Sequence, residues 1–234
     1  MPIKNKPIIA ISMGDPSGIG PEIICKSLSE IIFEYDFHPL ILGNFDALEH
    51  IDNIIKSHLK FLKIDSLSRI SDLNSDIIPV MDDSNLDFSK ISPGVVSATA
   101  GYASMKWVLH SGRLADSKEV DAVVSCPINK ESCGMAGSGA IGHMELFQEQ
   151  TNSKNVATML MTPGLRVVHL STHKSLKEAC DYVTFKNVYT KIELIHTDFK
   201  KLGFIKPKIG VSALNPHGSD GGLFGTEEKE HILP

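Results

Sequence analysis

Apolar and polar residues along this chain fall into blocks whose periods predict strands and helices in turn. Short apolar runs that end at turn residues predict strands, and apolar residues three and four positions apart predict helices. The strand-like runs are residues 7–14, 39–44, 76–82 and 120–127, and the helix-like segments are residues 20–35, 45–59 and 94–115. This alternation predicts an α/β fold with a largely parallel sheet covered on both faces.

The second half of the chain has a different order of elements. Residues 156–172 contain two strand-like runs joined at Thr-Pro-Gly, which predicts a hairpin. Helices are expected over residues 175–183 and 187–203, and a further strand over residues 206–215 leads into a glycine-rich loop. A hairpin within a parallel pattern predicts a mixed sheet in this half of the chain.

Composition and charge argue against several classes of protein. The 234 residues carry a net charge of -5 without a basic stripe that could neutralise phosphates, so nucleic-acid binding is not expected. No apolar run reaches the length of about 18 residues that a transmembrane helix needs. The first apolar run stops at Gly14, too early for a signal peptide, so a cytoplasmic protein is expected. The four cysteines form no C-x-x-C pair, which indicates reduced, mostly buried thiols.

Two turns that follow predicted strands could carry chemistry. In "GDPSGIGPE", Asp15 stands at the carboxyl end of a strand, where open α/β sheets place functional groups. This stretch is either a tight turn that needs a positive φ or an anion site at a helix N-terminus. In "SCPINKE", Asn129 is expected to cap a helix, and Lys130 would stand near its start. Lys130 is either a solvated side chain or a contact for an acidic or phosphorylated partner.

Three histidines stand in loop contexts. His143 heads a predicted helix, and its ring either points into a cleft or lies at the surface. His173 and His217 each follow a predicted strand, and neighbouring strand ends lie about 5 Å apart, so the two rings could bind one divalent metal ion. The alternative is that both are turn residues, because ten histidines make a chance pair easy and two ligands are few for a tight site.

Taken in order, five stretches resemble the 4-hydroxythreonine-4-phosphate dehydrogenase family of vitamin B6 biosynthesis: "GDPSGIGPE", "CPINKE", "GHMELF", "STHKSLKEA" and "LNPHGSDGGLFGTEE". That family includes relatives that act on the phosphorylated sugar acids 4-phospho-threonate and 4-phospho-erythronate. The resemblance implies a fold similar to isocitrate and isopropylmalate dehydrogenases, with two α/β/α domains and mixed, largely parallel sheets. The first domain is expected over residues 1–130 and the second over 131–234, in a homodimer with its active site in the cleft between the domains.

The resemblance also implies cofactors, site residues and a reaction. His173 and His217 match two of the family's three metal-ligand histidines, for zinc or else cobalt, nickel, iron or magnesium. His143 and Met144 match substrate-contacting positions, and Asp15 and Lys130 match positions that line or support the cleft. The implied small phosphorylated hydroxy acid is 4-phosphooxy-threonine. It would be oxidised at C3 by NAD or NADP and then decarboxylated to 3-amino-2-oxopropyl phosphate, in pyridoxal 5'-phosphate biosynthesis.

The sequence departs from the family pattern in two places. The family's Gly-His-Thr is Gly-His-Met here, so Met144 lacks a hydroxyl whose hydrogen bond would be worth about 0.5–1.5 kcal/mol, enough to shift substrate preference. Family members continue beyond the position of Pro234 into a His-Asp-Gln stretch that carries the third metal histidine, so the chain is expected to be incomplete. The alternatives are therefore a dehydrogenase of a phosphorylated sugar acid or a truncated non-catalytic paralogue.

Overall fold

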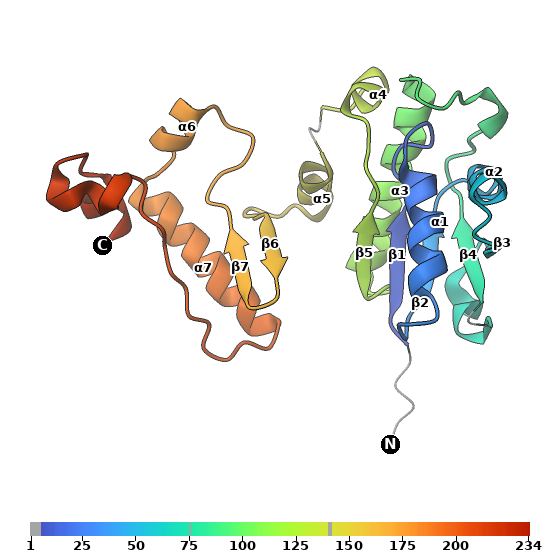
Figure 1. Cartoon of the computed structure of the whole chain (residues 1–234), viewed down its shortest axis with the longest axis horizontal. Coiled ribbons are helices and arrows are strands. Elements are labelled where there is room, and N and C mark those ends of the chain that lie inside the picture. Colours follow the sequence, from blue (N-terminus) through green and yellow to red (C-terminus); the bar gives the residue numbers. More distant parts are fainter. Residues whose placement is uncertain (1–5, 75, 140–141) are drawn as a thin grey trace. The chain divides into compact units, whose positions relative to one another are not determined.

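The computed structural model of this chain describes residues 6–74, 76–139 and 142–234 (Figure 1). Its contacts divide the chain into two compact units, one that ends at Ser153 and one from Lys154 to Pro234. The predicted domain ranges, 1–130 and 131–234, do not coincide with these units, because helices that follow residue 130 pack on the first unit. That division into domains stays a prediction.

A five-stranded parallel sheet forms the centre of the first unit, in the order β3-β4-β2-β1-β5. Ser12 at the end of β1 lies opposite Leu42 of β2 and opposite Ser125 of β5. The strands are β1 (Ile8–Ser12), β2 (His38–Leu42), β3 (Lys60–Lys63), β4 (Ile77–Met81) and β5 (Ala122–Ser125). The carboxyl ends of β1, β2 and β5 therefore lie at one edge, where open α/β sheets bind ligands.

Helices cover both faces of this sheet (Figure 1). Right-handed crossovers place α1 and α2 on one face and α3, which leads from β4 to β5, on the other. α3 packs closely on α4, since a Cβ at Gly101 would lie 2.0 Å from the Ser132 carbonyl oxygen. The helices are α1 (Gly20–Ile31), α2 (Phe45–Ile55), α3 (Ala98–Asp116), α4 (Lys130–Met135) and α5 (His143–Thr151), with the short 3-10 segments η1 (Leu67–Asp72) and η2 (Phe88–Lys90).

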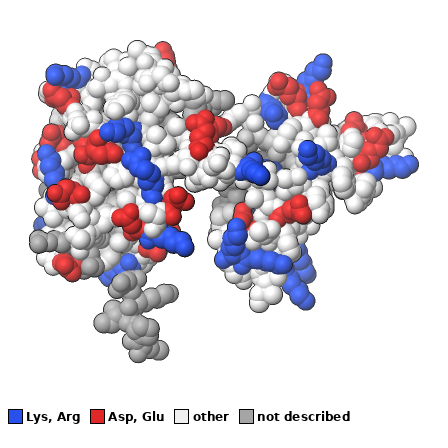
Figure 2. Space-filling view, turned by 180° about the vertical axis from the view of Figure 1, so that it is seen from behind, with Lys and Arg blue, Asp and Glu red and all other residues white. Residues whose placement is uncertain are grey.

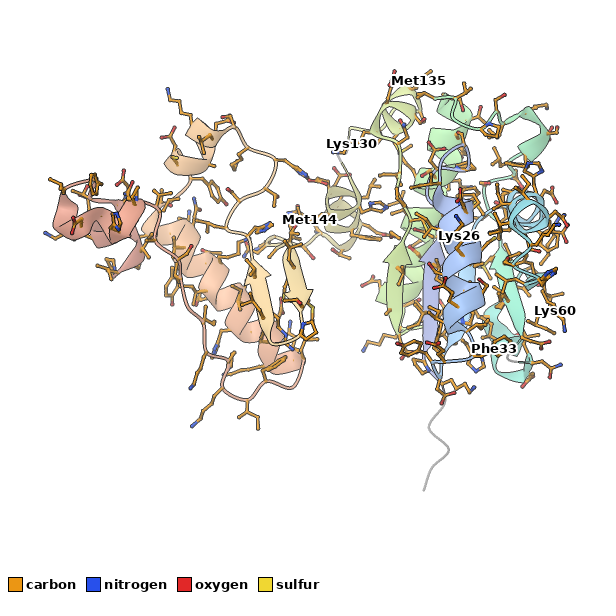
Figure 3. The ribbon with its side chains drawn as sticks, viewed as in Figure 1. Lys26, Phe33, Lys60, Lys130, Met135 and Met144 are labelled. Carbon is orange, nitrogen blue, oxygen red and sulfur yellow. The ribbon has the colours of Figure 1, made fainter. Side chains whose placement is uncertain are left out.

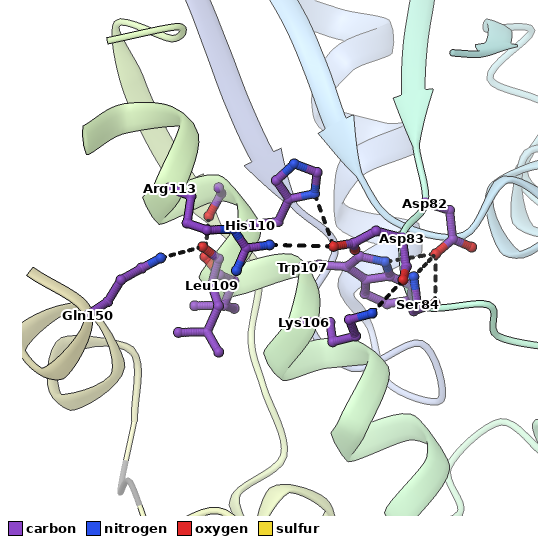
Figure 4. A network of polar contacts seen from close by, with 11 residues as sticks. Asp82, Asp83, Ser84, Lys106, Trp107, Leu109, His110, Arg113 and Gln150 are labelled. Atoms are coloured by element: carbon purple, nitrogen blue, oxygen red, sulfur yellow. Dashed lines mark hydrogen bonds and ion pairs between the residues drawn. The ribbon is translucent and has the colours of Figure 1, made fainter. Parts of the chain in front are cut away.

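A polar network ties α3 to the loops after β2 and β4 (Figure 4). Trp107 is fully buried in the core and donates from Nε1 to Asp82 Oδ1 at 3.0 Å. Asn44 donates to the other oxygen of that carboxylate at 2.9 Å. The next residue, Asp83, lies 3.2 Å from the ring of His110 on α3. Because a partly buried carboxylate needs hydrogen-bond donors, the two bonds to Asp82 hold α3 and the loop after β2 against the loop after β4.

The sheet differs from the prediction at both edges. β3 lies in a segment for which the sequence predicts no strand, because its four residues are few and two of them are lysines. The strand predicted over 120–127 is present as β5, but the predicted sheet covered on both faces would bury it, whereas it is an edge strand in which Val124 is 50% exposed. A short edge strand is held by pairing with one neighbouring strand, and this pairing cannot be read from the composition of the strand itself.

The second unit contains the predicted hairpin, which the structure confirms. β6 (Met159–Thr162) and β7 (Leu165–Val168) pair antiparallel, with the turn at Pro163 and Gly164 and a φ of 84° at Gly164. Ser175 caps α6 and Thr184 caps α7, in each case by accepting a hydrogen bond from a backbone amide. The remaining elements are α6 (Leu176–Asp181), α7 (Phe185–Lys201), the irregular η3 (Pro216–Gly222) and the π-helical η4 (Glu228–Ile232).

The strand predicted over residues 206–215 is wrong, because these residues are not in a strand. Residues 206–214, β7 and α7 instead border an apolar groove of about 750 Å³. Among the described residues of this unit, Val188 is the one apolar side chain that is buried. A strand needs a neighbour for its backbone groups, and no strand of the described residues pairs with 206–215.

The surface carries charges of both signs. On the face drawn in Figure 2, basic and acidic side chains both occur on each of the two units. Across the described ranges, none of the helices combines the length and apolar character needed to span a membrane.

Candidate functional site

The loops after β1 and β5 meet at the carboxyl edge of the parallel sheet. Gly14 has a φ of 71°, which confirms the predicted turn with a positive φ, and a Cβ there would lie 2.3 Å from the Pro127 carbonyl oxygen. The backbone amide of Asp15 donates to that same oxygen at 3.0 Å. The glycine is therefore required twice, once by the backbone conformation and once by the approach of the neighbouring loop.

Asp15 is buried within the loop after β1. Its Oδ1 accepts hydrogen bonds from the backbone amide and the hydroxyl of Ser17, both at 2.8 Å. Burial, with a smaller contribution from the charge of Asp15, raises the pKa of the Cys133 thiol on α4. Asp15 therefore holds its own loop and stands close to α4, so its observed role is positioning.

His143 joins this group from the first residue of α5. Its half-buried ring donates a hydrogen bond to the backbone carbonyl of Cys126, which directly follows β5. Burial lowers the pKa of His143 below its ordinary value, and the hydrogen bond offsets this only in part. Ring atom Nε2 is buried and has no hydrogen-bond partner among the described residues. The structure thus brings the predicted residues Asp15 and His143 to the same sheet edge. Nε2 of His143 stays available there for a hydrogen bond.

We expect His143 to titrate below pH 6.5, the ordinary value for histidine, because burial disfavours the charged ring. As the pH falls below about 6.5, the unfolded chain takes up this proton first, so the free energy of unfolding decreases until the lower folded pKa is passed. NMR titration of the imidazole signals, with His143→Gln to assign the resonance, measures the midpoint. A midpoint at or above 6.5 in the folded chain would contradict the buried, neutral ring.

Lys130 and Met144 lie on the same unit (Figure 3). The predicted cap is confirmed, since the Asn129 side chain accepts from the Ser132 amide at 2.9 Å and α4 begins at Lys130. Lys130 is exposed, and Met144 on α5 is half-buried. The Met144 thioether has no hydrogen to donate, so any polar contact it makes with a ligand is a weak acceptor contact.

His173 and His217 both lie in the second unit and both are exposed. His173 follows β7 by five residues, and His217 stands inside η3, so the expectation that they occupy neighbouring strand tips is wrong. They share an unusual backbone, with φ of 56° at His173 and 55° at His217. Left-handed conformations are unfavourable for residues other than glycine and cluster at functional sites, which makes these two loops candidates for function.

Imidazole is a suitable type of ligand for a divalent ion, but two imidazoles are too few for a tight site. Neutral imidazole nitrogens suit zinc, cobalt, nickel or iron, whereas magnesium prefers oxygen. Within residues 6–74, 76–139 and 142–234, no group of three or more His, Cys, Asp or Glu side chains is placed to hold a metal ion. His173 and His217 would therefore be partial ligands, and a tight site needs a further donor.

Two carboxylates that are not among the predicted site residues support the His217 loop. Glu227 and Glu228 follow the glycine-rich stretch and both accept hydrogen bonds from Asn215. Glu228 is buried and also accepts from Ser219. The signal was the pair of adjacent glutamates directly after a loop rich in glycine, since a carboxylate there can satisfy backbone amides that lack helix or sheet partners.

Comparisons with known proteins agree with the five quoted motifs. The profile of the family "Pyridoxal phosphate biosynthetic protein PdxA" matches residues 36–234. A Clostridium botulinum (strain Hall) protein, provisionally named D-threonate 4-phosphate dehydrogenase, is 36% identical over 238 residues. That match covers 99% of this chain and 69% of the relative. The resemblance drawn from the motifs is confirmed.

Solved structures give the same result for the α/β fold. A 4-hydroxythreonine-4-phosphate dehydrogenase from Burkholderia phymatum matches with a TM-score of 0.84 at 33% identity, over 98% of this chain and 69% of that one. The enzyme of the same name from Klebsiella pneumoniae matches with a TM-score of 0.85 at 32% identity, over 96% of this chain and 67% of that one. In sequence, in fold and in the order of its motifs, this chain belongs to the PdxA family.

Proposed function

We propose that this chain acts as a dehydrogenase that oxidises 4-hydroxythreonine 4-phosphate at C3, with NAD or NADP as hydride acceptor and a divalent ion. Loss of CO₂ from the oxidised acid would then give 3-amino-2-oxopropyl phosphate, for pyridoxal 5'-phosphate biosynthesis. The observation that carries the proposal is the meeting of family motifs at one sheet edge, where His143 has a buried ring nitrogen with no hydrogen-bond partner among the described residues. Family membership supplies the reaction class.

Each candidate residue has a defined task in this proposal. His143 donates to the Cys126 carbonyl and keeps its ring neutral, so Nε2 can accept a hydrogen bond from a substrate hydroxyl. Asp15 holds the loop that faces this ring, and Lys130 offers an exposed cation for the substrate phosphate. His173 and His217 would hold the ion, which when bound acidifies the reacting hydroxyl and polarises the resulting carbonyl. The hydride chemistry belongs to the nicotinamide.

A second candidate substrate is a phosphorylated sugar acid. The observation that favours it is the name of the Clostridium botulinum relative, a D-threonate 4-phosphate dehydrogenase. The two substrates differ at C2, which carries an ammonium group in one and a hydroxyl in the other. Met144 can accept only weakly and donates nothing, so it offers little to distinguish these groups where the family pattern has a hydroxyl.

We also propose a homodimer that works in the cytoplasm. The apolar groove of the second unit and exposed side chains such as Leu165, Val167 and Val211 support burial of this face against another protein surface. Large exposed apolar patches mark interaction sites in soluble proteins. Sedimentation of the full chain measures the oligomeric state.

The test of the function is an assay of NAD and NADP reduction by the full chain, with each of the two phosphorylated acids and with zinc, cobalt or magnesium added in turn. We expect reduction that depends on a divalent ion and stops when a chelator removes it. Preference for one acid decides between the two candidate substrates. Absence of reduction with either acid under every metal and cofactor combination would favour the non-catalytic paralogue.

A further inference from the structure

We propose that Glu228 is the positioning residue that fixes the backbone of the His217 loop, and through it the direction of the His217 ring. The inference rests on the proposed function for its link to a metal ion, but its structural part stands on the contacts of Glu228 alone. Glu228 begins η4 and lies eleven positions beyond His217 in the sequence. No motif used above assigns it a task.

The loop around His217 has a backbone that requires support. From His217 to Gly221, each of the consecutive residues has a positive φ, with 55° at His217, 70° at Ser219 and 44° at Asp220. L-residues disfavour this left-handed region, so such a run persists only where the surroundings hold it. Contacts from residues outside positions 217–221 must therefore stabilise this backbone conformation.

Glu228 supplies those contacts from a buried position. Its Oε1 accepts hydrogen bonds from the backbone amides of Leu214, at 2.9 Å, and Asn215, at 2.6 Å. Its Oε2 accepts from the Asn215 side chain at 3.0 Å and from the Ser219 hydroxyl. Glu228 as a residue is only 7% exposed, so water competes little for these bonds. One carboxylate therefore uses both oxygens to satisfy four donors.

These contacts lie on both sides of His217. Asn215 precedes it by two residues and Ser219 follows it by two, so Glu228 holds the loop before and after the histidine. The adjacent Glu227 accepts from the Asn215 side chain at 2.8 Å, so it contacts the loop on the side that precedes His217. Outer contacts of this kind set the orientation of metal-ligating side chains in general.

The experiment compares Glu228→Gln with the matched control Glu227→Gln in the full chain. Glutamine keeps the size of the side chain but has one acceptor oxygen, so it cannot serve both sets of donors. Hydrogen exchange of the Leu214 and Asn215 amides is measured without metal, and affinity for zinc alone is measured by calorimetry. We expect exchange at these amides to become at least about tenfold faster in Glu228→Gln and to change little in Glu227→Gln, with zinc affinity lowered about 10–100-fold in the former.

The outcomes separate this inference from the proposed function. Unchanged amide exchange in Glu228→Gln would overturn the positioning role, whatever happens to zinc. Faster exchange with unchanged zinc affinity would overturn the link between the loop and the ion. If the unmodified chain binds no zinc, the metal part of the proposed function fails, while amide exchange still decides whether Glu228 holds the loop.

Discussion

Replacing His217 with alanine in the full chain is expected to lower zinc affinity by at least about 100-fold and to remove the metal-dependent part of NAD(P) reduction. Changes to the groups that merely orient metal ligands cost about 10–100-fold, so removal of a ligand should reach or pass that range. The described residues place no cluster of three ligating side chains, so the loss of one imidazole cannot be compensated nearby. Calorimetry with zinc and the metal content of the purified protein measure the effect.

The matched control is His196→Ala, which removes an exposed imidazole from α7 of the same unit. Its zinc affinity should equal that of the unmodified chain. His173→Ala should resemble His217→Ala, and the double variant should be no worse than either single one, because residues that act as one site are not additive. Unchanged affinity in His217→Ala would reject the ligand role and, with it, the metal part of the proposed function.

The strands and helices at the centre of the first unit could be predicted because their own residues determine their secondary structure. Runs such as 7–14 and 39–44 are mostly apolar and stop at turn residues. β1 lies within the first run, and β2 begins one residue before the second. The helix over 20–35 carries its own start signal, Pro21, at the first turn. β3 could not be predicted, because its order comes from pairing with β4 rather than from its own four residues.

The second unit shows the opposite case. Residues 206–215 have strand-like composition, yet strand formation depends on a neighbour that the local sequence does not name. The candidate site has the same limit. The loop contexts of His143 and His217 mark them as candidates, whereas the contact of His143 with the Cys126 carbonyl and the loop contacts of the Glu228 carboxylate join residues far apart in the sequence. Hydrogen-bond partners that are distant in the sequence are brought together by the topology of the fold, so the periodicity of the sequence does not reveal them.

Gly14→Ala is expected to destabilise the first unit by about 2–5 kcal/mol, from roughly 1–2 kcal/mol for a left-handed alanine and about 1–3 kcal/mol for overpacking. The new Cβ would lie 2.3 Å from the Pro127 carbonyl oxygen and 2.7 Å from that of Cys126, which are backbone atoms that cannot rotate away. Urea unfolding followed by the fluorescence of Trp107, the single tryptophan and fully buried in this unit, measures the loss.

Gly94→Ala separates the two causes of that loss. Gly94 has a φ of 75°, close to the 71° of Gly14, but a Cβ there would meet nothing within 4 Å. It should therefore cost only the conformational part, roughly 1–2 kcal/mol, and the difference between the variants measures the contact between the loops after β1 and β5. Because the Cys126 carbonyl also accepts from His143, displacement of that loop should move the His143 resonance in Gly14→Ala but not in Gly94→Ala. Equal losses of stability in the two variants would mean that the loops after β1 and β5 move apart at no cost. The contact between them would then not hold the sheet edge that carries His143.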